Sequence, residues 1–139
     1  VVTQPNQPAF QAKTTGGIGD GNDIILTSTY VNTGNHYSTT NGRFTAPVAG
    51  VYLFFWSAIG NTANDVYRWF LRKNGSNVGD IHLRQDTSGS GSEYATNGSR
   101  VQMISLSAND YVSIYFDSDG GTSAYHQGEY VTFGGYLIG

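Results

Sequence analysis

Two aspartates spaced for metal binding stand near the end of a β-rich segment. The run Asp117-Ser118-Asp119-Gly120-Gly121 presents carboxylate and hydroxyl oxygens at a calcium-like spacing. The same residues also form turns, because aspartate side chains accept hydrogen bonds from nearby backbone N–H groups. An EF-hand would need a downstream glutamate flanked by helices, and the sequence has no helical pattern there. The segment is therefore either a solvated turn or part of a metal site.

A second group of polar and aromatic residues lies between the apolar runs, in segments rich in Gly, Ser and Thr. Tyrosine offers a flat apolar face with a polar tip, and amide side chains hydrogen-bond hydroxyl groups. This combination suits recognition of a sugar or a protein surface. The alternative is that each tyrosine covers one end of the core. The candidate ligand-binding residues are Asn61, Asn64, Gln85, Tyr94, Asn97, Tyr125, His126 and Gln127.

Groups suited to catalysis are scarce. The chain has no cysteine and no Gly-x-Ser-x-Gly nucleophile motif. Glycoside hydrolysis needs two carboxylates flanking a cleft, whereas Glu93 and Glu129 are the only glutamates and both fall in expected loops. The three histidines are far apart in the sequence, which disfavours one histidine metal site within a subunit. We therefore predict that the protein is not an enzyme.

Length and charge narrow the class of partner. The chain has 139 residues, which is enough for one domain with its own core. Charged residues make up 12% and the formal net charge is −3, with no basic stripe, so we predict no nucleic-acid partner. The longest apolar stretch, residues 48–59, is too short to span a bilayer, so we predict no membrane insertion.

The elements that must position these residues are strands. Helical periodicity with capping residues is absent, while 19 Gly, 10 Tyr and 7 Phe favour strands joined by turns. The fold class is therefore all-β. We expect strands at residues 8–13, 23–31, 50–59, 66–73, 78–84, 99–106, 111–117 and 130–138.

The strand expected at 50–59 is apolar at both odd and even positions. A strand with one wet face would alternate, so this one is predicted to be covered on both sides. In one small domain, a partner subunit is the simplest cover for the second face. The residues we assign to the surface shared between subunits are Tyr52, Phe54, Trp56, Tyr111 and Tyr115. The residues we assign to the opposite surface are Val51, Leu53 and Phe55.

The connections predict two unlike ends of the domain. Asn74-Gly75 suits a tight type I′ hairpin. If successive strands are antiparallel, alternate connections lie at opposite ends, so the tight turns share one end with the C-terminal strand end. The other end is expected to carry the binding loops, because recognition usually lies on loops held by a rigid scaffold. Those loops are residues 60–65, 85–98 and 118–129.

The spacing of several residues resembles the signature of the complement C1q globular-head family. Leu26, Asn32, Tyr37 and Phe44 stand at the family's intervals before the run Gly50-Val51-Tyr52-Leu53-Phe54-Phe55-Trp56. Pro8-Ala9-Phe10-Gln11-Ala12 is similar to the family's opening segment. Phe133-Gly134-Gly135-Tyr136-Leu137 is similar to its closing segment.

This resemblance implies a ten-stranded jelly-roll β-sandwich of the C1q and tumour necrosis factor type, homotrimeric and without enzymatic activity. Residues 8–139 would form the globular domain and residues 1–7 a linker from a longer parent chain. Several family members hold calcium near the apex of the trimer. The resemblance points to carboxylates in the loop before the strand at 99–106, where this sequence has Asp86 and Glu93. Together with Asp117 and Asp119, which their spacing singles out, these are the candidate calcium ligands.

We therefore expect a homotrimeric recognition head that binds a glycan or protein receptor through its apical loops. It would form the distal tip of a larger fibrous protein, either a phage or viral tail fibre or a secreted lectin-like protein. The expected location is extracellular or on the virion surface. The alternative is a purely structural trimerisation domain without a ligand.

Overall fold

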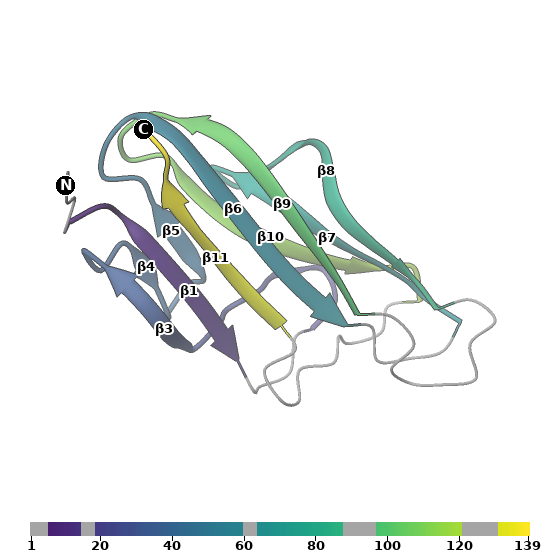
Figure 1. The fold of residues 1–139 in the computed structure, drawn as a ribbon. Helices are drawn as coiled ribbons and strands as arrows, with labels where there is room; N and C mark the ends of the chain where they lie inside the picture. Colours follow the sequence, from purple (N-terminus) through teal and green to yellow (C-terminus); the bar gives the residue numbers. More distant parts are fainter. Residues whose placement is uncertain (1–5, 15–18, 60–63, 88–96, 121–130) are drawn as a thin grey trace.

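Two antiparallel sheets pack face to face in the computed structural model of the chain (Figure 1). The structure describes residues 6–14, 19–59, 64–87, 97–120 and 131–139. Strands and their connections make up these ranges, and no helix long and apolar enough to cross a membrane is found in them. The predicted all-β class is confirmed.

Ten strands follow two five-strand paths, which is the jelly-roll arrangement expected from the resemblance. The first sheet has the order β3-β1-β11-β6-β9, with bounds Ser28–Thr33, Ala9–Thr14, Val131–Leu137, Gly50–Ile59 and Asn97–Leu106. The second sheet has the order β4-β5-β10-β7-β8, with bounds Tyr37–Ser38, Arg43–Thr45, Tyr111–Ser118, Val66–Lys73 and Ser76–Asp86. A two-residue strand, β2 (Asn22–Asp23), is added beside β10.

The single strand expected at 23–31 is wrong, because the chain changes sheets within it. β2 pairs with β10 of the second sheet, whereas β3 pairs with β1 of the first. Between them Ile24 and Leu26 are buried in the core. The alternation of Ile24 and Leu26 therefore belongs to a segment that passes from one sheet to the other. The same alternation would be expected of a strand, so the sequence does not distinguish the two.

Aromatic side chains fill the space between the sheets. Phe10 stacks on Tyr37 and on Phe44, with ring centroids 4.9 and 4.8 Å apart, and meets Phe133 edge-on at 4.9 Å. Such ring pairs add to the stabilisation that area burial gives. These four rings come from β1, β4, β5 and β11, so one cluster joins both sheets.

The spaced residues of the sequence signature contact one another. The Tyr37 hydroxyl donates to the Leu26 carbonyl at 3.3 Å and accepts from the Leu26 N–H at 3.2 Å. The Asn32 amide donates to the Tyr37 carbonyl and accepts from its N–H. Burial raises the pKa of Tyr37 to about 12. The signature therefore fixes the irregular segment that enters the second sheet.

The side chains of β6 are divided between core and surface. Tyr52, Phe54 and Trp56 are at most 1% exposed and fill the core of one subunit. The prediction that these three residues line a surface between subunits is therefore wrong. The alternate residues, Val51 among them, point away from the core on the outer face of the first sheet.

The outer face of the first sheet is apolar over much of its area. The register places Met103, Leu53 and Tyr136 in one row across β9, β6 and β11. A Cβ at Gly134 would lie 2.4 Å from Phe55, so glycine there lets the Phe55 ring lie close against β11. The exposed large apolar residues on this face, called the apolar face below, are Val31, Val51, Val101, Met103 and Tyr136.

Tyr111 and Tyr115, also predicted at a subunit interface, lie on the outer side of the second sheet. The Arg43 guanidinium lies 4.3 Å from the Tyr111 ring centroid, and that of Arg72 lies 3.5 Å from the Tyr115 centroid. Arginine stacked on a ring in this way is a favourable cation–π contact. These two tyrosines are therefore not part of the apolar face.

The predicted hairpin at Asn74-Gly75 is confirmed. Both residues have positive φ, 51° and 82°, and Lys73 pairs with Ser76 across the two-residue loop. Type I′ turns require this backbone, which asparagine and glycine adopt readily. The same end carries the C-terminal strand end, where Val51 N–H donates to the Gly139 carbonyl.

Candidate functional site: the loop end of the sandwich

The strand ends opposite the tight turns lie together at one end of the sandwich, called the loop end below (Figure 1). The register pairs Ile59 with Asn97 in the first sheet and Val66 with Asp86 in the second. The predicted grouping of the long connections is therefore supported by the strands they join. Outside the described residues are Asn61, Glu93, Tyr94, Tyr125, His126 and Gln127.

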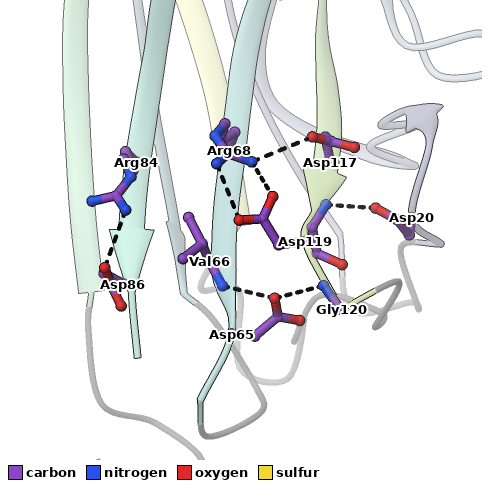
Figure 2. A network of polar contacts seen from close by, with 10 residues as sticks. Asp20, Asp65, Val66, Arg68, Arg84, Asp86, Asp117, Asp119 and Gly120 are labelled. Atoms are coloured by element: carbon purple, nitrogen blue, oxygen red, sulfur yellow. Dashed lines mark hydrogen bonds and ion pairs between the residues drawn. The ribbon is translucent and has the colours of Figure 1, made fainter. Parts of the chain in front are cut away.

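Asp65 joins three of the segments that reach the loop end (Figure 2). This carboxylate is buried, and it accepts the N–H groups of Val66 at 2.7 Å and Gly120 at 2.8 Å. A Cβ at Gly120 would lie 2.8 Å from the carboxylate, so the approach needs glycine. Thr87 completes the arrangement, because its hydroxyl accepts from the Asp65 N–H at 2.8 Å and its own N–H donates to the Asp65 carbonyl.

Arg68 of β7 holds two of the predicted metal ligands. Its guanidinium donates to both carboxylate oxygens of Asp119, at 2.5 and 3.2 Å, and lies 3.6 Å from Asp117 (Figure 2). The hydrogen bond from Arg68 lowers the pKa of Asp119. A third predicted ligand, Asp86, pairs with Arg84 at 3.1 Å.

As the structure arranges them, Asp117 and Asp119 do not fit a calcium site. The guanidinium of Arg68 lies where Asp117 and Asp119 would have to converge on a cation, and a calcium ion needs six to eight oxygen ligands. No group of three or more acidic or histidine side chains able to hold a metal occurs in the described part of the chain. The arginine neutralises the carboxylates instead.

Asp20, which we did not predict, attaches the N-terminal part of the chain to the same network. Its carboxylate accepts the N–H of Ser118 at 2.6 Å (Figure 2). Ser118 ends β10 next to Asp119, so this contact fixes the last residue of the strand. Three aspartates from distant segments thus hold the bases of the loops in place.

The prediction that Gln85 contacts a ligand is wrong. Its side chain is 1% exposed and lies between the sheets. It accepts from the Trp69 indole N–H at 3.1 Å and donates to the Ala58 carbonyl at 2.6 Å, while the Trp56 indole donates to the Trp69 carbonyl. Gln85 therefore belongs to a buried polar brace that joins β6 to β7 and β8.

The two remaining candidate amides lie at the margin of the loop end. Asn64 is exposed, with φ of 61°, in the turn before β7. Asn97 begins β9, and its side chain lies outside what the structure describes. Their backbone positions are compatible with the predicted binding role, which the described residues do not test.

Asp65, Arg68 and Asp20 form the main contacts at this end, and sequence reasoning did not find them. Asp65 and Arg68 flank the start of a strand whose apolar pattern was recognised. The alternation of apolar and polar residues within that strand could have placed Arg68 on the outer face of the second sheet. Asp117 of β10 lies opposite Arg68 on that face. Only the pairing of β7 with β10 makes that relation visible.

Comparison with known proteins agrees with this geometry. The family model described as C1q domain matches residues 9–138. Complement C1q tumor necrosis factor-related protein 3 of Mus musculus is 30% identical over 133 residues, covering 95% of this chain and 51% of the relative. Its Homo sapiens counterpart is 29% identical over 138 residues, with the same coverage of 95% and 51%.

The chain thus spans about half the length of these relatives. A solved structure titled globular domain of zebrafish complement 1qA protein superposes with a TM-score of 0.70 at 21% identity. It covers 96% of this chain and 98% of that one, which establishes the shared fold. The match of the family model over nearly the whole chain shows that this chain belongs to the C1q domain family.

Proposed function

We propose that the protein is a homotrimeric recognition head that binds a glycan or protein receptor at its loop end. The observation that carries this proposal is the apolar face, which one subunit leaves exposed. Val101 and Met103 are 60% and 58% exposed there, although both are large apolar side chains. Contiguous apolar surface of this kind marks a protein–protein contact.

A closed ring is the expected assembly. The apolar face carries Met103 and Val101 as protrusions on β9, at one margin of the sheet. Near the other margin a hollow of about 330 Å³ lies beside Phe55 and Val31. In a ring with rotational symmetry, each subunit contacts its neighbours through two different patches. The protrusion at one margin of the apolar face and the hollow near the other margin are two such patches. The homotrimer is the ring typical of C1q domains.

The loop end is the proposed binding surface, because it lies opposite the end where β11 finishes. Its described bases are fixed by Asp65 and by the Arg68 ion pairs, so the loops leave from a rigid platform. In a ring, three copies would present their loops together, and weak individual contacts would then gain from avidity. Binding without catalysis is the role that such a platform supports.

The assembly is tested by charge insertion. Met103→Glu should convert the trimer to a folded monomer in sedimentation velocity, because three carboxylates would enter an apolar contact. Ile25→Glu is the matched control, since Ile25 is 44% exposed outside the apolar face, and it should stay trimeric. A wild-type chain that sediments as a monomer at micromolar concentration would refute the proposed assembly.

Receptor binding is tested on the assembled protein with a glycan array and a panel of cell-surface proteins. Replacing residues 60–63, 88–96 and 121–128 together by Gly-Ser segments of equal length should abolish binding without altering sedimentation. Binding that survives this replacement of all three loops would place recognition elsewhere.

A second candidate is a structural trimerisation domain without a ligand. The observation in its favour is that Asp117, Asp119 and Asp86 are paired with arginines within the subunit. Silence of the intact trimer on both panels, with assembly unaffected by the loop replacements, would select this role.

We further propose an extracellular or virion-surface location at the tip of a longer fibrous protein, where a trimeric head would meet its receptor. The support is the family relation and the fact that the chain spans about half of its relatives. Immunogold labelling of intact fibres or virions tests this, with labelling confined to the tip as the expected result.

A further inference from the structure

A polar groove lies on the side of the sandwich, apart from the loop end. β8 and β9 are the edge strands of different sheets and are not paired with each other. Between them a groove of about 680 Å³ is lined by Asp80, His82, Leu83, Arg84, Ser99, Arg100 and Val101. The groove is open to solvent along the edge of the sandwich.

Arg100, like Arg43 on the opposite sheet, forms no ion pair with an acidic side chain of the described residues. Its guanidinium reaches from β9 across the groove and donates to the His82 carbonyl of β8 at 2.7 Å. Arg68, Arg72 and Arg84 each have an aspartate partner. No aspartate or glutamate within the described ranges lies at ion-pair distance from Arg100. The groove therefore contains a positioned positive charge that is not neutralised.

The remaining lining residues add both donors and acceptors. Arg84 is half exposed and contributes a second guanidinium, although Asp86 neutralises part of its charge. The side chain of Asp80 is 92% exposed and offers acceptor oxygens, and Ser99 offers a hydroxyl. Leu83 supplies apolar surface, whereas Val101, which also borders the groove, belongs to the apolar face.

We propose that this groove binds a saccharide unit that carries one carboxylate. The carboxylate would pair with Arg100, and a guanidinium is the side chain best suited to bind it with two parallel hydrogen bonds. Sugar hydroxyls would donate to Asp80 and accept from Arg84 and Ser99, while the C–H face of the ring covers Leu83. A ligand with many negative charges fits less well, because Asp80 and Asp86 would repel it.

An acidic peptide is the competing occupant, and the groove disfavours it. A peptide added as a strand along β8 needs the free backbone groups of that edge. The Arg100 side chain already uses the His82 carbonyl there. The saccharide site is also separate from the loop end, so it adds a second kind of recognition to the proposed function.

The test is a titration of the assembled, ¹⁵N-labelled protein with glucuronic acid and with N-acetylneuraminic acid, followed by amide shifts. Both acids should shift the amides of His82, Arg84 and Arg100, and the neutral sugar N-acetylglucosamine should bind about tenfold more weakly. Equal binding of the neutral sugar, shifts confined to other regions, or no shifts at all would overturn the proposal.

Variants separate the site from general charge effects. Arg100→Gln should weaken binding of both acids about tenfold. Arg72→Gln removes the same charge on the outer face of the second sheet and should leave binding unchanged. Arg84→Gln, at an exposed position, provides a second test if Arg100→Gln lowers the thermal midpoint. Unchanged affinity in both groove variants, or competition by hexaglutamate at equal concentration, would contradict a saccharide site.

Discussion

The buried brace around Gln85 makes a stability prediction that the structure specifies closely. Gln85→Leu keeps a similar volume but removes the acceptor of the Trp69 indole N–H and the donor to the Ala58 carbonyl. Both groups would remain in a site from which water is excluded, since Gln85 is 1% exposed. An unsatisfied buried polar group costs about 1–3 kcal/mol.

Two such groups, partly offset by the added apolar surface of leucine, give an expected loss of about 2–4 kcal/mol in the free energy of unfolding. For a domain of this size that corresponds to roughly 10 °C in Tm. The protein has two tryptophans, Trp56 and Trp69, and both belong to the brace. Tryptophan fluorescence during urea unfolding therefore reports directly on this region, at one fixed protein concentration because assembly affects stability.

Gln102→Leu is the matched control for Gln85→Leu. The Gln102 amide donates to the Met103 carbonyl in an exposed contact, so this change should alter the free energy of unfolding by no more than about 0.5 kcal/mol. If Gln85→Leu unfolds at the same urea concentration as wild type, the brace does not stabilise the fold and the reasoning is refuted.

Three further outcomes follow from the polar contacts. Asp65→Leu removes the acceptor of two backbone N–H groups and should lower the free energy of unfolding, measured in urea, by about 2–3 kcal/mol. Asp65→Asn keeps one acceptor oxygen and should lower that free energy by less. Equal losses in the two variants would contradict the role of that oxygen. Hydrogen bonds from Asn74, Ser107 and Lys73 lower the pKa of Asp110 from 3.8 to about 2. Because the folded-state pKa is the lower one, the stability that this carboxylate provides is complete above pH 3.8 and is lost as the pH falls through about 2. The difference in Tm between wild type and Asp110→Asn should therefore shrink over that range, and a constant difference would be inconsistent with it. Finally, EDTA and added calcium should give the same Tm, because the Arg68 guanidinium already pairs with Asp117 and Asp119. Calcium that binds, at a concentration 100 times its Kd, would raise the free energy of unfolding by about 2.7 kcal/mol, so a rise of several degrees in Tm would reveal a site.

The polar contacts and the apolar face divide the molecule into two functional regions. At the loop end, Asp65 accepts backbone hydrogen bonds and Arg68 pairs with aspartate within the subunit, and these contacts make the bases of the loops rigid. On the first sheet, Met103 and Val101 remain exposed with no cover from the subunit itself. In the proposed trimer, assembly therefore depends on the first sheet, and the proposed receptor binding depends on the loop end.

Local sequence patterns predicted the parts of the fold that depend on near neighbours. The hairpin at Asn74-Gly75 follows from the backbone preferences of two residues. The long strand at 50–59 follows from a run of apolar residues and was found with its observed bounds. The spacing of Leu26, Asn32 and Tyr37 indicated the family before any contact among them was known.

The candidate site was predicted less well, because its contacts join distant segments. Arg68 and Asp119 are 51 residues apart, and their pairing depends on the register of β7 with β10. Gln85 was expected at the surface because it is an amide beside a polar loop, but the cross-sheet contact with Trp69 places it in the core. Long-range pairing of this kind leaves no local pattern.

The sequence alone predicted that β6 is covered on both sides, because both sets of its alternate residues are apolar. Only the tertiary structure decided that Tyr52, Phe54 and Trp56 face the core and that Val51 remains outside. The physical reason is that successive side chains of a strand point to opposite faces. Because both sets of alternate β6 residues are apolar, hydrophobicity alone does not decide which set faces the core. The choice is made by the sheet that packs opposite, whose Trp69 meets Trp56 across the core.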